Sequence, residues 1–290
     1  MKASTLQFVL FLLIVLWALS ACQAADSSLW EVVAEHNVHH GVMTAGFLNE
    51  KYGITGRPGN MNHTIDGGQS WLEDVNSSDC RYGMEILDEQ HAWTCGGMTH
   101  IRRSDDGGNI WQEAASFGLS RDGPCRLMSF IDLQNGWLAS PNHMGVTADG
   151  ADSWTIMNEP EGTEYITGIG LYAPHHGYMM NSSGALYHTT NNGVEWARVS
   201  SLKPDGWEFA RTVYAVVTMR FHDREHGIIV MYLKKGNEEQ VVAYHTADGS
   251  KTWTSELVPT KPGPLYIAQD GRLLTVITGP NIMTVLRYNG

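Results

Sequence analysis

Two short segments of the sequence, DCR and PCR, place an arginine directly after a cysteine, at Arg81 and Arg126. A guanidinium group can bind a carboxylate through two parallel hydrogen bonds, so this pair is a candidate clamp for an anion or a carboxylate. The alternative is that both arginines form structural ion pairs with Asp79, Asp122 or Glu164. The residues alone leave both interpretations open.

Other basic and aromatic residues lie in segments that vary between the repeats described below, where binding residues on a rigid scaffold are expected. The whole candidate binding set is Arg57, Arg81, Arg126, Trp207, Arg211 and Tyr214. Trp207 is either a loop anchor or a platform for a sugar. The sequence contains no phosphate-binding loop, nucleophile elbow or metal-ligand spacing. We therefore predict no catalytic residue, no cofactor and no metal.

One eight-residue pattern, S/T-x-D-x-G-x-x-W, recurs five times and sets where these candidates lie. The copies begin at residues 64, 104, 147, 189 and 246. The acidic or amide side chain can accept hydrogen bonds from its own turn, Gly supplies positive φ, and Trp opens the next strand. The predicted structural residues are Asp66, Trp71, Asp106, Trp111, Asp149, Trp154, Asn191, Trp196, Asp248 and Trp253. Asn191 in place of Asp, and Ala151 in place of the second Gly, predict two looser turns.

A strand–turn–strand element precedes each copy, and the copies start 40, 43, 42 and 57 residues apart. This spacing is typical of propeller blades with four strands each. Five complete blades run from about Val38 to Glu256, and three further strands follow. The segment SLWEVVAE, from Ser28, matches the fourth strands and is expected to complete the last blade and close the ring. The sequence therefore predicts an all-β, six-bladed β-propeller closed by its N-terminal strand.

The pattern is identified as the Asp-box, or BNR repeat. Because strands run up and down, the Asp-box turns and the turns between strands 1 and 2 share one face, here called the Asp-box face. The candidate binding residues fall on the opposite face, called the loop face. Cys80 and Cys125 would begin inner strands of neighbouring blades, so a Cys80–Cys125 disulfide is preferred over Cys80–Cys95.

The N-terminal segment predicts export. Lys2 precedes an uncharged apolar run, and LSAC, Leu19 to Cys22, resembles the bacterial lipobox. Cleavage there would leave Cys22 to carry lipid; the alternative is ordinary cleavage after Ala24. The expected organisation is a signal peptide at 1–21, a short tether at 22–27 and one propeller at 28–290. The net charge of −12 argues against nucleic-acid binding.

The strand–turn–strand element carries the more specific resemblance. FIDLQNGW, beginning at Phe130, matches the F-x-D-x-x-x-G-W pattern typical of the Ycf48-like photosystem II assembly and stability factors. That resemblance implies a non-catalytic, exported and often lipidated propeller that holds partner proteins during assembly. The best-known members have seven blades, so six blades are a departure that puts the photosynthetic role in doubt.

Sialidases share the Asp-box and the six-bladed count but need an arginine triad, a Tyr–Glu pair and an early RIP motif. The early GRPG segment lacks the apolar residue, and no spacing singles out Tyr165 beside Glu164 or Tyr214 near Arg211. We therefore expect a protein-binding scaffold or assembly factor at the cell envelope. It would be a monomer, bind a protein or peptide through its loop face, and touch the membrane only through a lipid anchor. The alternative is a secreted glycan-binding protein or sialidase-like glycoside hydrolase.

Overall fold

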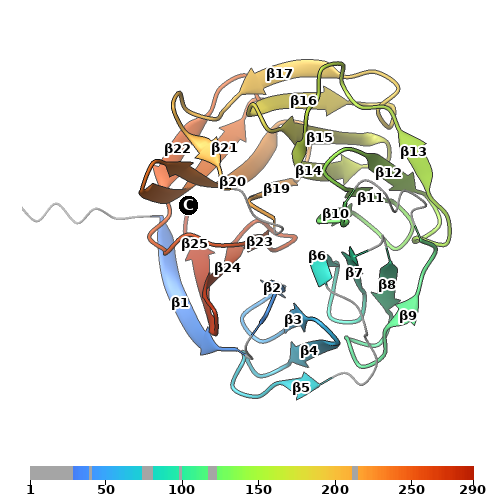
Figure 1. The fold of residues 1–290 in the computed structure, drawn as a ribbon, viewed down its shortest axis with the longest axis vertical. Helices are drawn as coiled ribbons and strands as arrows, with labels where there is room; N and C mark the ends of the chain where they lie inside the picture. Colours follow the sequence, from blue (N-terminus) through green and yellow to red (C-terminus); the bar gives the residue numbers. More distant parts are fainter. Residues whose placement is uncertain (1–28, 39–40, 74–80, 98–99, 117–122, 211–214) are drawn as a thin grey trace, which may run out of the picture.

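Six antiparallel sheets stand around a central axis and form a ring (Figure 1). The computed structural model describes residues 29–38, 41–73, 81–97, 100–116, 123–210 and 215–290, and these contain strands but no α-helix. Each sheet is one blade, with its first strand next to the axis and its fourth strand at the rim. The predicted six-bladed β-propeller is confirmed.

The first three blades follow the sequence order from axis to rim. Blade 1 contains β2 (Thr44–Phe47), β3 (Gly53–Arg57), β4 (Asn60–Thr64) and β5 (Leu72–Glu73). Blade 2 contains β6 (Arg81–Ile86), β7 (Ala92–Gly96), β8 (Ile101–Ser104) and β9 (Gln112–Glu113). Blade 3 contains β10 (Leu127–Phe130), β11 (Gly136–Ala139), β12 (Met144–Thr147) and β13 (Thr155–Met157).

The later blades include one enlarged sheet and the closing blade. Blade 4 contains β14 (Ile166–Ala173), β15 (His176–Asn181), β16 (Ala185–Thr189) and β17 (Ala197–Ser201). Blade 5 contains β18 (Glu208–Phe209), β19 (Val217–Phe221), β20 (His226–Lys235), β21 (Glu238–Ala247) and β22 (Thr254–Leu257). Blade 6 contains β23 (Leu265–Ile267), β24 (Leu273–Gly279), β25 (Ile282–Tyr288) and β1 (Trp30–Asn37).

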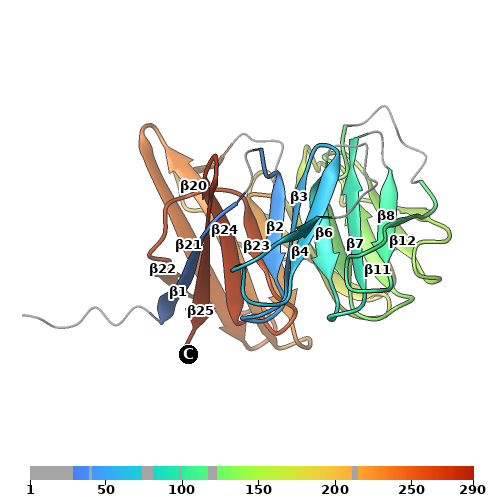
Figure 2. The same ribbon diagram turned by 90° about the horizontal axis from the view of Figure 1, so that it is seen from below.

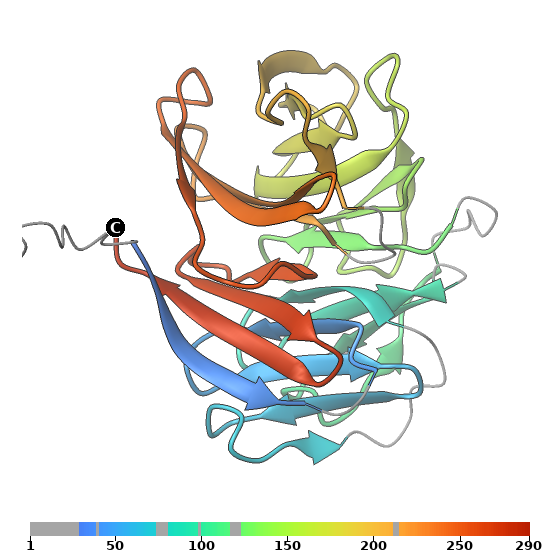
Figure 3. The ribbon, with the colours of Figure 1, turned by 60° about the vertical axis from the view of Figure 1, so that its left-hand side comes forward.

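The ring is closed by β1, which forms the outer strand of blade 6 beside β25 (Figure 3). The two strands are antiparallel and pair from Trp30 with Tyr288 to Asn37 with Ile282. This pairing ties the N-terminal part of the propeller to the last strand of the chain, so no sheet in the ring lacks its outer strand. The predicted closure by the N-terminal strand is confirmed.

The hydrophobic core is divided among the blade interfaces. Each of six clusters of buried side chains joins neighbouring blades. Between blades 2 and 3, for example, Trp93 stacks on Phe130 with ring centroids 4.0 Å apart. Successive side chains in a strand point to opposite faces of the sheet, so each blade contributes to the interface on either side. Burial between blades, rather than inside one blade, therefore holds the ring together.

The Asp-box turns are built by hydrogen bonds within each repeat. In blade 1, the Thr64 hydroxyl donates to the Asp66 carboxylate at 2.8 Å, and the Ser70 N–H donates to the same carboxylate at 2.9 Å. Blade 4 keeps this geometry with an amide, because the Glu195 N–H donates to Asn191 Oδ1 at 3.0 Å. The expectation that the Asn191 turn would be looser is therefore not met in its hydrogen bonding.

Each turn is also fastened to the turn between strands 1 and 2 of its own blade. The Gly67 N–H donates to the Lys51 carbonyl at 2.8 Å, and the Gly249 N–H donates to the Glu225 carbonyl at 3.1 Å. These contacts place both kinds of turn on one side of the ring, the lower side in Figure 2. The turns of the Asp-box face are thus held by the same hydrogen bonds in blade after blade. The connections on the loop face lack this shared pattern and differ between blades.

Candidate functional site

A pocket of about 570 Å³ opens on the loop face, where blades 3, 4 and 5 meet. Its walls come from the connections β11–β12, β13–β14, β15–β16 and β17–β19. The lining residues are Arg126, Leu127, Ala139, Ser140, Pro141, Glu164, Tyr165, Ile166, Thr167, Ser182, Lys203, Glu208, Phe209, Ala210, Ala215 and Val216. Its volume lies within the range of ordinary ligand pockets. Apolar and charged side chains share the lining, as expected of a site for a peptide rather than for a purely apolar molecule.

Backbone hydrogen bonds hold the walls of this pocket in place. The Ile166 N–H donates to the Pro141 carbonyl at 2.8 Å, which joins blade 4 to blade 3. The Ser182 N–H donates to the Tyr165 carbonyl at 2.8 Å. The Tyr165 side chain itself is exposed at the surface. The pocket is therefore preformed, with an exposed aromatic ring on its wall.

Arg126 is the predicted binding residue that the structure places in this pocket. It precedes β10 and also lines a small cavity of about 40 Å³ along the propeller axis. Burial lowers the pKa of its guanidinium group, which means that the charged form has lost part of its hydration. A partly desolvated guanidinium group next to a pocket suits an incoming carboxylate, because the bond it forms competes with less water.

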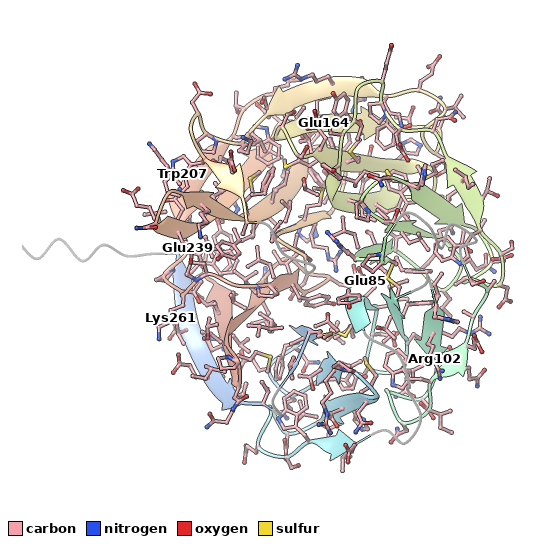
Figure 4. The ribbon with its side chains drawn as sticks, viewed as in Figure 1. Glu85, Arg102, Glu164, Trp207, Glu239 and Lys261 are labelled. Atoms are coloured by element: carbon pink, nitrogen blue, oxygen red, sulfur yellow. A yellow bond between two sulfur atoms is a disulfide. The ribbon has the colours of Figure 1, made fainter. Side chains whose placement is uncertain are left out.

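The pocket also contains two carboxylates and a lysine. Glu164 and Glu208 come from the connections before and after blade 4, and Figure 4 shows Glu164 on that side of the ring. Lys203 donates from Nζ to the Trp207 carbonyl at 2.8 Å. Cationic and anionic groups therefore lie at different points of the wall, an arrangement that would fix the orientation of an asymmetric ligand.

Of the other predicted binding residues, the two whose side chains the structure describes, Arg57 and Trp207, do not line this pocket. Arg57 forms an ion pair with Glu73, with Nη2 and Oε1 2.7 Å apart, within blade 1. Trp207 is partly buried and packs against the core cluster between blades 4 and 5, as expected of a loop anchor. Arg81 begins β6, but its side chain lies outside what the structure describes. Cys22, Cys80, Arg211 and Tyr214 also lie outside the described residues.

The axis is crossed by a buried charge pair that the sequence interpretation did not identify. Glu85 on β6 and Arg220 on β19 come from blades 2 and 5, and Glu85 Oε1 lies 2.6 Å from Arg220 Nη2. Gln269 donates to the same Glu85 oxygen at 2.7 Å and to the Phe130 carbonyl at 2.9 Å. Figure 4 shows Glu85 near the centre of the ring. Burial raises the pKa of Glu85 to about 7, although Arg220 and Gln269 pull it down.

Tyr266 fills the same end of the axis. Its ring lies over Gly46, where an added Cβ would be 2.4 Å from the ring. Its hydroxyl accepts a hydrogen bond from the Ile86 N–H at 3.1 Å, so it links blade 6 to blade 2 across blade 1. Arg220 and Tyr266 both line the small axial cavity. Together with Glu85 they occupy the axis near the Asp-box face, which leaves the loop face as the side where a ligand can enter.

One disulfide corrects the sequence prediction. Cys125 is bonded to Cys95, so the predicted Cys80–Cys125 pair is wrong. Cys95 is in β7, and Gly83 of β6 lies between it and blade 3. A Cβ at Gly83 would come within 2.8 Å of both the Cys95 sulfur and the Arg126 backbone. The missing side chain at Gly83 therefore lets the Cys95 sulfur reach the neighbouring blade.

The described residues hold no group of three His, Cys, Asp or Glu side chains arranged for a metal ion. Within the same part of the chain, no helix is long and apolar enough to cross a membrane.

The fold and its turns define the class of this protein: it is a six-bladed Asp-box β-propeller with a preformed pocket on its loop face. The profile of the family described as photosynthesis system II assembly factor YCF48 matches residues 72–202. That match covers 131 of the 290 residues, and over this part the chain is similar to the Ycf48 family, in agreement with its strand–turn–strand elements.

Known proteins similar to this chain include relatives in sequence and in fold. Photosystem II assembly lipoprotein Ycf48 of Synechococcus sp. (strain CC9902) is 30% identical over 119 residues, which cover 39% of this chain. The match spans only about a third, 34%, of that relative's length. A structure described as YCF48 bound to D1 peptide has a TM-score of 0.56 at 13% identity, covering 92% of this chain and 97% of that one. Virginiamycin B lyase from Staphylococcus aureus has a TM-score of 0.59 at 11% identity, covering 89% and 99%. At these identities the structural likenesses show the fold alone.

Proposed function

We propose that this protein is a non-catalytic, exported propeller that holds a protein or peptide partner through its loop face during assembly at the cell envelope. The observation that carries the proposal is the loop-face pocket with Arg126 at its junction with the axial cavity. The axis near the Asp-box face is occupied by Glu85, Arg220 and Tyr266, whereas this pocket opens on the loop face. The protein would act as a monomer and be anchored by lipid at Cys22.

The pocket suits a short stretch of extended peptide. Its volume of about 570 Å³ is large enough for a few residues but small for a folded domain. Tyr165 and Phe209 offer ring surface, Arg126 a site for a carboxylate, and Glu164 a site for a basic side chain. Two similar proteins support this choice: a YCF48 has been seen bound to D1 peptide, and the Synechococcus relative is an assembly lipoprotein.

The non-catalytic part of the proposal is supported by the family description, which is that of an assembly factor. The similarity to a lyase of the propeller fold is one of architecture only. In the glycan-active alternative, the two carboxylates of the pocket, Glu164 and Glu208, would be the groups that act on a sugar. We keep this alternative as an outcome of the test below.

A pull-down with membrane-extracted protein tests the proposal. Tyr165→Ala and Arg126→Gln alter the pocket, whereas Gln69→Ala and Lys251→Glu alter exposed positions of the Asp-box face and serve as controls. We expect partner recovery to fall about tenfold or more with each pocket variant, as for residues at the centre of an interface. Recovery should be unchanged with the controls. Melting temperatures must be equal for all four variants.

Two results would overturn the proposal. One is recovery of the same partners by wild type and both pocket variants, which would make Arg126 a structural residue. The other is hydrolysis or specific retention of glycans by the purified protein, abolished by the same substitutions. That outcome would support the glycan-active alternative.

A further inference from the structure

The position where the chain enters the propeller is fixed on the Asp-box face. β1 is a fourth strand, so it begins at that face and runs toward the loop face (Figure 2). Leu29 is held there because its carbonyl accepts a hydrogen bond from the Asn289 N–H at 2.8 Å. The buried Trp30 ring packs against Tyr288 with centroids 5.2 Å apart. Any anchor upstream of Leu29 is therefore connected to the propeller at its Asp-box face.

The length of chain before that point limits how the molecule can sit. Seven residue steps separate Cys22 from Leu29, and at 3.3–3.6 Å per residue they reach at most about 25 Å. β1 has 8 residues, so the distance from its start to the loop-face rim is about 26 Å at 3.3 Å per residue. Even a fully extended tether between Cys22 and Leu29 would therefore bring Cys22 only about level with the loop-face rim. For the loop face to rest on the membrane that holds the anchor, the tether would have to be fully extended along blade 6, whereas contact through the Asp-box face requires no such extension.

The Asp-box face carries exposed apolar side chains on four consecutive blades. Ile65, Ile110 and Val194 lie in the Asp-box turns of blades 1, 2 and 4, and Leu133 lies in the β10–β11 turn of blade 3. Their exposed fractions are 65%, 62%, 70% and 49%. Among the described residues, the turns and connections of the loop face expose two large hydrophobic side chains, Tyr165 and Ile282. Apolar side chains in a row on one side of the ring suit shallow contact with a lipid surface, where burial of apolar area drives binding.

We propose that the propeller sits on the bilayer with its Asp-box face, through Ile65, Ile110, Leu133 and Val194, and holds the loop-face pocket away from the lipid. The proposal rests on the lipid anchor at Cys22 that is part of the proposed function. The pocket then opens about one blade height above the membrane surface. A partner would be recognised by a segment that projects into the aqueous compartment, not by a segment at the lipid surface.

Charge sets the kind of lipid surface that fits. The Asp-box turns carry carboxylates at Asp66, Asp149 and Asp248, which accept hydrogen bonds within their own turns. Their negative charge still disfavours a surface rich in anionic headgroups. The contact surface is therefore zwitterionic or uncharged lipid, and the apolar tips rather than ion pairs make the contact. The tether, not the charge, sets the orientation.

The test uses residues 22–290 with Cys80→Ser, coupled through the Cys22 thiol to a maleimide lipid in phosphatidylcholine vesicles. The two remaining cysteines are joined in the buried Cys95–Cys125 disulfide and do not react. A fluorescent amino acid is placed at position 194 on the Asp-box face or at position 165 on the loop face. A quencher attached to the lipid headgroup then reports which position approaches the bilayer. We expect strong quenching at position 194 and none above background at position 165.

A second variant tests the contact residues. In unanchored protein carrying Cys22→Ser, the triple change Ile65→Ser, Ile110→Ser and Leu133→Ser should lower partitioning into the same vesicles by roughly tenfold. The matched triple on outer strands, Leu72→Ser, Val199→Ser and Leu257→Ser, should not. Equal or reversed quenching at 194 and 165 would overturn the orientation. Equal partitioning of the two triples would overturn the contact surface.

This test is separate from that of the proposed function. The vesicle experiment supplies its own lipid, so it reports geometry whether or not cells modify Cys22. Mass spectrometry of the membrane-extracted protein shows the modification itself, and loss of partners from the pocket variants shows recognition. An unmodified Cys22 would remove the anchor from the proposed function, whereas a reversed orientation would remove only the present inference.

Discussion

Loss of the disulfide between blades 2 and 3 should be the most informative single perturbation of this fold. Cys95 and Cys125 are both buried in the cluster that also contains Trp93 and Phe130. The bond joins β7 to the segment that leads into β10, and it spans the whole second Asp-box turn. The double variant Cys95→Ala/Cys125→Ala removes it without leaving a thiol behind.

The expected loss in free energy of unfolding follows from the length of the loop that the disulfide closes. The two cysteines are 30 residues apart, and the entropy of closing such a loop in the unfolded chain corresponds to about 3.6 kcal/mol at 25 °C. Removing two buried sulfur atoms, which leaves a methyl side chain at each position, adds a packing loss of about 1 kcal/mol. We therefore expect the free energy of unfolding to fall by about 4–5 kcal/mol. This is a large share of the stability of an ordinary domain.

The assay is urea unfolding followed by tryptophan fluorescence, with and without dithiothreitol. The double variant should unfold at a lower urea concentration than wild type, and dithiothreitol should lower the wild-type midpoint but leave the variant unchanged. Thiol alkylation of the denatured, unreduced protein should leave Cys95 and Cys125 unlabelled. Labelling of either one, or equal wild-type midpoints in both buffers, would refute the reasoning.

Three further changes test other parts of the structure. Gly46→Ala should lower the free energy of unfolding by about 1–3 kcal/mol, because its Cβ would lie 2.4 Å from the Tyr266 ring. As a control, Gly97→Ala should leave the melting temperature unchanged, because no atom of the described residues lies within 4 Å of its Cβ. Hydrogen bonds from the serine of its own turn lower the pKa of Asp66 from 3.8 to about 2, so its contribution to stability is present above pH 3.8 and is lost as the pH falls through 2. Asp66→Asn should flatten that part of a plot of urea midpoint against pH, and an unchanged slope would contradict this. Burial raises the pKa of Glu85 from 4.5 to about 7, so its contribution is present below pH 4.5 and is lost as the pH rises through 7. Glu85→Gln should remove the corresponding fall in urea midpoint between pH 5 and 8, and a variant that keeps the wild-type fall would show that another group causes it.

The architecture was predictable because its signal is local and repeated. An Asp-box turn needs its hydroxyl, its carboxylate or amide, and its Trp at fixed spacing, and each copy marks the start of a fourth strand. The blade boundaries follow from five such marks. The closure by β1 follows from a segment with no other partner that resembles a fourth strand. These inferences require only neighbours in sequence and the rule that sheet edges are paired.

The disulfide was not predictable in the same way because it depends on a contact between blades. Register alone brings Cys80 and Cys125 to the starts of neighbouring inner strands. The observed partner, Cys95, is on a second strand, and it reaches blade 3 only because Gly83 has no side chain. A glycine inside a strand is a known sign of close approach. The sequence does not show, however, which side chains or strands approach Gly83.

The axial charge pair shows what information the repeats contain and what they lack. The first residue of each aligned strand–turn–strand element is Gly46, Glu85, Ser129, Gly170 or Arg220 in turn. Equivalent positions of different blades face the same axis at the same height, so an acidic and a basic residue in this set are candidates to meet. Whether they meet depends on the number of blades, because only in a six-bladed ring do the second and fifth blades lie directly opposite. The charge pair therefore follows from the sequence once the closure by β1 fixes the ring at six. The loop-face pocket cannot be derived from the sequence in this way, because its walls come from connections that do not repeat between blades.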